Sequence, residues 1–381
     1  MCSIAWPGVP GEERCWAVSG PDGVVDKTAA RDGRRVTLKE VAKAAGVSVG
    51  MASRVLSNYG SFSDATRQRV ESAAKSLDYR PNHLARSLRV GRTKAIGVVV
   101  SNILSYHWTT FIRSIEAAAS ERGYQVILGT TADDPAAELA YLRTLQERNV
   151  DGIILSPSPV NEPFVMKLIE SGLPMVLIEN YNAELRVPRI NIDDRAAAEG
   201  ATRHLIDQGH ERIGIVAGNQ SLLSGQGRLQ GYRDALTAAG LPVDESLITI
   251  GNYRFEPAYK ATEALLSLPQ PPTALLVCNE LMTGAALQCL KDRGVSLPDE
   301  LSLVAFDDPA WTSFFRPAIT TVRTPRVEIA RLALETLLGL LADPESRDAS
   351  AVERKIATEF VVRESVVPPR ASVSPSAHRS A

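Results

Sequence analysis

The chain has 381 residues, of which 44% are hydrophobic and 23% are charged, and its formal net charge at pH 7 is −2. This composition is ordinary for a globular protein, and the length is sufficient for two or three domains with sizeable cores. No run of about 18 apolar residues exists that would span a membrane, and the first 35 residues lack the apolar segment of a signal peptide. We therefore expect a cytoplasmic protein with no membrane partner.

The four cysteines argue against a disulfide framework and against a zinc site. They are Cys2, Cys15, Cys278 and Cys289, and no two of them have CxxC spacing. Cys278 and Cys289 lie in apolar segments, so we expect both to be small buried residues.

The small net charge hides a division of the chain. Residues 31–94 contain 14 Lys and Arg against 5 Asp and Glu, a net charge of +9, which leaves −11 for the rest. A compact basic block ahead of an acidic body predicts a polyanion partner for the first part. A solvated basic surface is the alternative interpretation.

The first predicted helix begins after a long extension. Residues 1–34 have no sustained periodicity, and we interpret them as a flexible extension. Thr37 and Glu40 have the spacing of a capping box, which predicts a helix from Leu38. Gly46 is expected to end that helix.

Three further helices are predicted in the basic block. Ser48 is a good N-cap for a second helix that ends near residue 56, and Ser63 is a good N-cap for a third over residues 64–77. A short fourth helix is expected over 82–88, since Pro81 is favourable in a first helical turn.

From Ala95 onward the pattern changes to short apolar runs that alternate with amphipathic helices. This alternation is typical of parallel strands covered on both faces. Two series of runs predict an α/β core of two doubly wound parallel-sheet subdomains that face a cleft, in which ligands bind at the carboxyl ends of the strands. The Pro- and Ser-rich residues after Val366 are expected to be disordered. The runs are 95–101, 124–131, 150–158 and 173–179, then 212–218, 246–252, 274–280 and 301–308.

The first two predicted helices have the features of a helix-turn-helix. Small and apolar residues stand where the helices cross and turn, namely Ala42, Gly46, Val47, Ala52 and Val55. The second helix is then expected to expose Val49, Gly50, Ser53, Arg54 and Asn58. Arg54 suits bidentate reading of guanine, and Ser48 and Ser53 suit phosphate contacts. A helical hairpin with solvent-facing polar residues is the alternative.

Residues 37–90 resemble the DNA-binding headpiece of the lactose/galactose repressor (LacI/GalR) family. The motifs are VTLKEVAKAAGVS, SRVL, TRQRV, LDYRPN and ARSL. The resemblance implies that residues 82–88 form a hinge helix whose leucine, here Leu88, wedges between base steps in the minor groove. It implies DNA contacts by Thr37, Ser48, Val49, Gly50, Ser53, Arg54, Asn58, Tyr79, Asn82, Ala85, Leu88 and Arg89.

Two positions of the headpiece depart from the family pattern. Met51 stands where Thr is common and cannot bond a phosphate, and Ala52 stands where a branched residue is common. Val49 and Gly50 carry no hydrogen-bonding side chains. Base readout is therefore expected to depend on Arg54 and on DNA deformability.

The rest of the chain, to about residue 366, resembles the effector-binding core of the same family, which is similar to type I periplasmic sugar-binding proteins. The motifs include VDGIILSP, ERIGIVAG, GRLQGYRDAL, PTALLVCNELM, LSLVAFDD and RPAITTVRTP. By position, the implied effector contacts are His107, Trp108, Glu179, Arg228, Tyr253, Asn279 and Asp307. Aromatic faces and charged planar groups are also what a sugar requires.

Each of these positions has a structural alternative. The alternatives are a core position for Trp108, a surface position for His107, a helix cap for Glu179 and for Asp307 or Asp308, and an interdomain salt bridge for Arg228. The run Ser105 to Trp108 replaces the family's Asn-Pro and two aromatics, and Glu179 and Glu280 stand where Asp is common. A differently shaped effector is therefore expected, and no particular sugar is indicated.

The sequence favours neither an enzyme nor a cofactor. Residues 225–231, GQGRLQG, do not have the spacing of a dinucleotide loop, and His210-Glu211 lacks the second His of a zinc protease. A Walker loop is missing from the sequence. We therefore expect no catalytic residues, no metal and no cofactor.

Together these patterns predict a homodimeric, nucleoid-associated repressor that binds a pseudo-palindromic double-stranded operator and responds to a small-molecule effector such as a sugar. A pure sugar-binding or transport module is the rival, but it predicts a signal peptide and no basic headpiece. The expected divisions are an extension (1–34), a DNA-binding domain (35–80), a hinge and linker (81–92), a core (93–366) and a tail (367–381).

Overall fold

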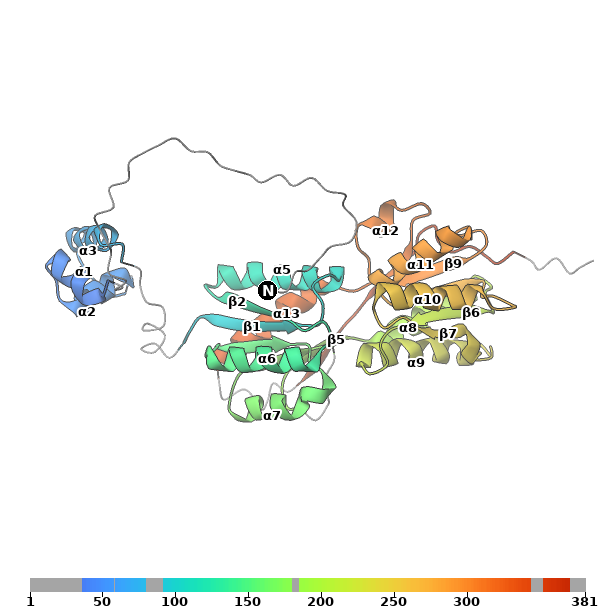
Figure 1. The fold of residues 1–381 in the computed structure, drawn as a ribbon, viewed down its shortest axis with the longest axis horizontal. Helices are drawn as coiled ribbons and strands as arrows, with labels where there is room; N and C mark the ends of the chain where they lie inside the picture. Colours follow the sequence, from blue (N-terminus) through green and yellow to red (C-terminus); the bar gives the residue numbers. More distant parts are fainter. Residues whose placement is uncertain (1–35, 58, 80–91, 180–184, 344–351, 371–381) are drawn as a thin grey trace, which may run out of the picture. The chain divides into compact units, whose positions relative to one another are not determined.

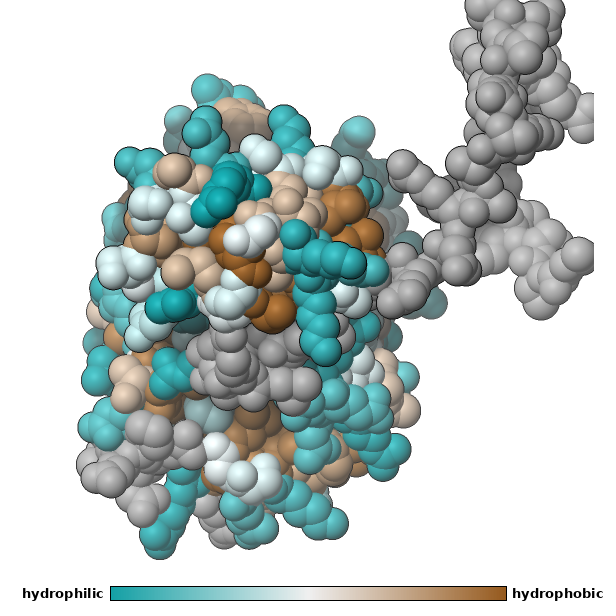
Figure 2. All heavy atoms as spheres, turned by 90° about the vertical axis from the view of Figure 1, so that its left-hand side faces the viewer, coloured by the Kyte–Doolittle hydropathy of each residue, from teal (hydrophilic) through white to brown (hydrophobic). Residues whose placement is uncertain are grey.

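The computed structural model describes residues 36–57, 59–79, 92–179, 185–343 and 352–370. The chain divides into two compact units, residues 1–83 and residues 84–381, and each is described by itself. Within the described ranges, no helix is long and apolar enough to cross a membrane. On the face shown in Figure 2, hydrophilic side chains surround smaller apolar patches.

In the first unit, called the headpiece, the described residues form three helices whose ends are set by the predicted caps. They are α1 (Leu38–Ala45), α2 (Val49–Leu56) and α3 (Asp64–Ser76). The capping box is confirmed, because Thr37 Oγ1 accepts from the Glu40 amide while the Thr37 amide donates to Glu40 Oε2 at 2.6 Å. Gly46 ends α1 with φ of 64°, and Ser48 and Ser63 accept from the amides of Met51 and Thr66.

The headpiece has its own small core, which fixes the angle between its helices. Its buried side chains come from all three helices and are small or β-branched. Such side chains let the short helices approach closely, as a helix-turn-helix requires. They are Val41, Ala42, Ala45, Ala52, Val55, Val70, Ala73 and Ala74.

The second unit, called the core, contains two six-stranded sheets. The first has the strand order β11-β5-β4-β3-β1-β2 and is parallel throughout, and the second has the order β12-β10-β9-β8-β6-β7 with only β12 antiparallel. The first sheet consists of β1 (Ala95–Val100), β2 (Gln125–Thr130), β3 (Gly152–Leu155), β4 (Met175–Ile178), β5 (Arg189–Ile192) and β11 (Glu353–Ile356). The second consists of β6 (Ile213–Ala217), β7 (Ile248–Ile250), β8 (Ala274–Val277), β9 (Ser302–Phe306), β10 (Thr320–Arg323) and β12 (Glu359–Val361).

Helices cover both faces of each sheet (Figure 1), as expected for strands that are apolar on both sides. The first sheet packs α5 (Tyr106–Glu121) and α13 (Arg326–Ala342) on one face, and α6 (Pro135–Glu147) and α7 (Glu162–Glu170) on the other. The second sheet packs against α8 (Asp194–Asp207), α9 (Leu223–Ala238), α10 (Phe255–Leu266) and α11 (Glu280–Arg293). The single-turn helix α12 (Trp311–Phe314) follows β9, and short 3-10 turns lie at Pro159–Asn161 and Glu245–Leu247.

The chain passes between the two subdomains three times. It leaves the first sheet after β5 to form α8, returns after β10 to form α13, and crosses again between β11 and β12. These three connections join the two subdomains, which we also call lobes. The carboxyl ends of the strands of both sheets face the boundary between the lobes.

The eight predicted strands are confirmed, but the prediction missed four. The missed strands are β5, β10, β11 and β12, each of three or four residues. The prediction that disorder begins directly after Val366 is wrong, because Val367 contacts the core. The Val367 amide donates to Ser302 Oγ at 3.0 Å, and the Val367 carbonyl oxygen lies 3.0 Å from a ring nitrogen of His210. Cys278 and Cys289 are buried, as expected.

Candidate DNA-binding and effector-binding sites

The exposed side of α2 is narrow and carries few hydrogen-bonding groups. Gly50 and Arg54 are exposed one turn apart, and Val49 is 41% exposed at the start of the helix. The expectation that Ser53 is exposed is wrong, because its side chain is buried. Because α2 packs against both α1 and α3, the buried side of this helix extends to Ser53.

Two hydroxyls predicted to contact DNA, those of Thr37 and Ser48, are already used as helix caps. Thr37 Oγ1 donates to Glu40 Oε2 at 2.8 Å, and Ser48 Oγ accepts from the Met51 amide at 3.1 Å. A hydroxyl that accepts a hydrogen bond still has its own hydrogen to donate. Ser48 therefore retains a donor for a phosphate oxygen.

The remaining predicted DNA contacts are only partly visible. Tyr79 is half-buried and packs against the headpiece core. Asn58, Asn82, Ala85, Leu88 and Arg89 lie outside the described residues.

The carboxyl ends of the core strands bring charged side chains from distant parts of the sequence together. Glu179 follows β4 and Asp307 follows β9, while His107 lies in the first turn of α5. His107 Nε2 contacts the carboxylate of Glu179, and Arg326 Nε donates to His107 Nδ1 at 3.0 Å. Because a guanidinium only donates, the ring proton of His107 must lie on Nε2, toward Glu179.

Asp307 and Glu280 form a buried carboxyl pair in this cluster. Burial raises the pKa of Asp307, but the contacting Arg326 guanidinium, together with Glu280, His107 and Arg228, holds this pKa well below its usual range. Glu280 Oε1 accepts from Ser105 Oγ at 2.6 Å and from the Tyr106 amide at 2.7 Å. Burial, followed by the charge of Asp307, raises the pKa of Glu280 to about 7. Glu280 thus links the two subdomains and is poised to hold a proton.

Arg228 lies on the other side of the cluster in a buried pair. Its Nε donates to Asp194 Oδ1 at 2.7 Å, and Nη1 contacts the carbonyl oxygen of Cys278. The guanidinium carbon lies 4.2 Å from the centre of the Phe306 ring. Burial raises the pKa of Asp194 to about 6 in spite of this partner.

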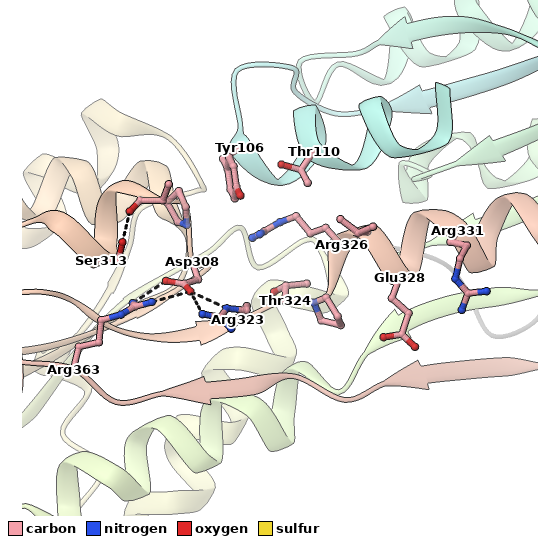
Figure 3. Close-up of a pocket in the computed structure, with 14 residues that line it drawn as sticks. Tyr106, Thr110, Asp308, Ser313, Arg323, Thr324, Arg326, Glu328, Arg331 and Arg363 are labelled. Carbon is pink, nitrogen blue, oxygen red and sulfur yellow. Dashed lines mark hydrogen bonds and ion pairs between the residues drawn. The ribbon is translucent and has the colours of Figure 1, made fainter. Parts of the chain in front are cut away.

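Two of the spaces that the described residues enclose lie at the subdomain boundary. One is closed and has a volume of only about 10 Å³, enough for about one water molecule. Its lining residues are His107, Glu179, Ile190, Asn191, Ile192, Asp194, Ser224, Arg228, Thr324 and Ile329. The other is an open pocket of about 760 Å³ between α5, α12 and the start of α13 (Figure 3).

Comparison with known proteins identifies the family. Residues 37–82 match the lacI family of bacterial regulatory proteins, and residues 202–366 match a periplasmic binding protein-like domain. The chain is 36% identical over 329 residues to the HTH-type transcriptional repressor CytR of Escherichia coli strain K12, which covers 86% of this chain and 95% of CytR. The chain belongs to the LacI family. It is therefore a DNA-binding transcriptional regulator.

Other LacI-family proteins show the same extent of similarity. Catabolite control protein A of Priestia megaterium is 32% identical over 326 residues, covering 85% of this chain and 98% of that protein. A solved complex of the transcriptional regulator CelR with cellobiose has a TM-score of 0.66 at 31% identity, covering 87% of this chain and 100% of that one. The Lac repressor dimer bound to operator and the anti-inducer ONPF has a TM-score of 0.78 at 24% identity, covering 88% and 100%, which supports the fold alone.

The seven predicted effector contacts of this LacI-family chain fall into two groups. His107, Glu179 and Arg228 line the closed space, and Asp307 joins them through Arg326. Trp108, Tyr253 and Asn279 line neither space. Trp108 packs in the core of the first subdomain, Tyr253 Oη lies 3.1 Å from Ser224 Oγ, and Asn279 Oδ1 caps α11 by accepting from the Met282 amide. Their contact with an effector stays a prediction.

Three of the described non-glycine residues with positive φ are predicted effector contacts. Glu179, Tyr253 and Asp307 have φ values of 62°, 57° and 72°, in the left-handed region that residues with a side chain rarely adopt. Each costs on the order of 1–3 kcal/mol and is retained where the surroundings fix it, which is common at ligand sites.

The sequence prediction missed three residues of the cluster. Asp194 and Arg326 are the first residues of α8 and α13, directly after the crossings from the missed strands β5 and β10. Ser105, the N-cap of α5, was noted only as part of an unusual run. A prediction of β5 and β10 as strands would have placed Asp194 and Arg326 at the same boundary as His107 and Asp307.

Proposed function

We propose that this LacI-family regulator is a homodimeric repressor whose affinity for a pseudo-palindromic operator is controlled by a small polyhydroxylated ligand, such as a sugar, bound between the two subdomains. The observation that supports this most strongly is the cluster around the closed space. It brings carboxylates and guanidinium groups from both subdomains into contact, in a chain whose N-terminal unit matches the lacI family.

The chemistry of the cluster suits neutral hydroxyl groups. Glu179 and Asp307 are acceptors, and Arg228 is a planar donor, so adjacent hydroxyls can be bound in pairs. Both arginines of the cluster already face carboxylates. The site therefore carries no excess positive charge that would select a phosphorylated ligand.

The three connections between the subdomains allow ligand binding to be coupled to DNA binding. A ligand that contacts both lobes favours one relative orientation of the lobes over another, and any such preference shifts the population of DNA-binding conformations. The same coupling requires operator DNA to change the affinity for the ligand by an equal factor.

Each segment predicted from the sequence is assigned one function. Residues 35–80 bind DNA, 81–92 form the hinge, and the core from 93 to at least Val367 binds the effector and dimerises. The extension 1–34 has no part in operator binding. The protein acts in the cytoplasm on the nucleoid and catalyses no reaction.

The proposal is tested by selecting DNA from a random library and by thermal-shift measurements with a panel of sugars that includes ribose and cellobiose. We expect a palindromic selected sequence and at least one sugar that raises the midpoint of unfolding. Glu179→Gln should abolish the sugar response, whereas Glu335→Gln, at a half-exposed residue that lines neither space, should leave it intact. An equal loss in both variants, or stabilisation by no sugar, would refute the effector site.

A further inference from the structure

The closed space and the open pocket are neighbours. Thr324, which follows β10, lines both of them. Effector-sized ligands occupy roughly 300–1,000 Å³. The closed space of about 10 Å³ cannot hold such a ligand, whereas the open pocket of about 760 Å³ has ample room.

Arg326 lies between the two spaces. Its side chain lines the open pocket, where the guanidinium carbon is 5.1 Å from the centre of the Tyr106 ring. In Figure 3 this side chain extends from the start of α13 toward Tyr106. On its other side it donates to His107, which lines the closed space, and contacts Asp307. A guanidinium thus holds two of the groups expected to bind the effector.

Arg326 uses only part of its hydrogen-bonding capacity in its contacts with His107 and Asp307. Arg326 is only 4% exposed, yet its Nη2 has no hydrogen-bond partner of good geometry among the described residues, although it contacts Asp307. The nearby Glu280 Oε2 is also buried and lacks a hydrogen-bond partner in the described part of the chain. Buried polar atoms that lack a hydrogen-bond partner are unfavourable. Ligand hydroxyls can serve both as acceptors and as donors.

We propose that Arg326 is a latch that stands in for the effector. Without ligand, its guanidinium occupies the place of ligand hydroxyl groups beside Asp307 and His107 and holds the cleft closed. The effector displaces it toward the open pocket. This inference rests on the proposed function, and it makes Arg326 a positioning residue that lowers effector affinity.

The first test needs no effector. Ser224→Cys places a thiol in the wall of the closed space, and iodoacetamide labelling at position 224 is followed by mass spectrometry. With Arg326 in place, we expect position 224 to be labelled slowly. Adding Arg326→Ala should raise the labelling rate about tenfold or more, because local opening then exposes the thiol more often. Arg331→Ala is the matched control, because Arg331 lines the open pocket but pairs with Glu335 on the surface, and it should change nothing.

Loss of Arg326 leaves the buried charge of Asp307 unpaired, so Arg326→Ala can fail to fold. The double variant Arg326→Ala/Asp307→Asn removes both charges and should show the same rise in labelling. Fast labelling with Arg326 in place, or equal labelling in the folded double variant and its parent, would overturn the latch.

The second test uses whichever sugar of the panel stabilises the wild type. The Arg326→Ala variant should bind that sugar at least about fivefold more tightly than the wild type. The reason is that the fraction of molecules whose cleft Arg326 holds closed no longer lowers the apparent affinity. Weaker binding would show Arg326 to be an ordinary ligand contact and would overturn the latch. If no sugar stabilises the wild type, the proposed function fails, while the labelling result still decides the latch.

Discussion

Replacing Glu280 by Gln should remove a pH dependence that the wild-type core carries. Glu280 is buried, and its pKa is raised from 4.5 to about 7 by burial and by the charge of Asp307. Folding thus favours the protonated form. The contribution of Glu280 to the free energy of unfolding is therefore complete below about pH 4.5 and is lost as the pH rises through about 7.

The size of the effect follows from the shift in pKa. At about 1.4 kcal/mol per unit, the whole shift corresponds to about 3 kcal/mol, and most of this is lost between pH 5 and pH 8. For a core of this size, that loss lowers the midpoint of thermal unfolding by about 4 °C. The groups that face Glu280 are Asp307, Ser105, His107 and the Tyr106 amide.

The assay compares the thermal unfolding of wild type and Glu280→Gln at pH 5 and pH 8. Glutamine keeps an oxygen to accept from Ser105 and Tyr106 but does not titrate. Asp194, whose pKa is raised to about 6, titrates in both proteins and cancels from the difference. The wild type should lose about 4 °C more than the variant between the two pH values. Equal losses would refute the buried carboxyl pair.

Three further predictions concern single side chains. Arg54→Ala should relax discrimination at one base pair per half-site by about 1–3 kcal/mol, and an unchanged preference in selection from random DNA would argue against direct readout. Thr37→Ala should destabilise α1 by about 1 kcal/mol, seen as faster hydrogen exchange of its amides, whereas Thr37→Ser should not. Gly231→Ala should destabilise the core by about 1–3 kcal/mol or more, since the new Cβ would lie 2.1 Å from the Arg195 carbonyl oxygen. Gly284→Ala, whose Cβ meets nothing closer than 3.9 Å, is its control in the same unfolding assay, and similar losses in both would contradict the packing argument.

The long apolar runs and the capping residues were sufficient to predict the architecture. Capping depends on local side-chain chemistry, so Thr37, Ser48 and Ser63 set the headpiece helices as expected. The strands at the centres of the sheets are buried on both faces and therefore read as continuous apolar runs.

Short strands near the sheet edges could not be predicted in this way. β5 and β10 have four residues each and contain Arg and Thr or Asn, so their hydrophobic pattern is weak. They form because the neighbouring strands offer hydrogen-bonding edges, which is tertiary information. Their omission also concealed Asp194 and Arg326, the residues that complete the charged cluster.

Contacts within the site depend on three-dimensional packing. The sequence placed His107, Glu179, Arg228 and Asp307 at the cleft, but it did not show that side chains fill the space between them. The buried position of Ser53 likewise depends on how α2 packs in the headpiece.

The central claim is that a ligand between the subdomains controls DNA binding by the headpiece. It is tested most directly by titrating the selected operator with the full chain, with and without the stabilising sugar, and following fluorescence anisotropy. We predict that saturating sugar changes the operator Kd by about fivefold or more, and that Glu179→Gln abolishes the change without altering the ligand-free Kd. A sugar that binds the core and leaves the operator Kd unchanged would contradict the account.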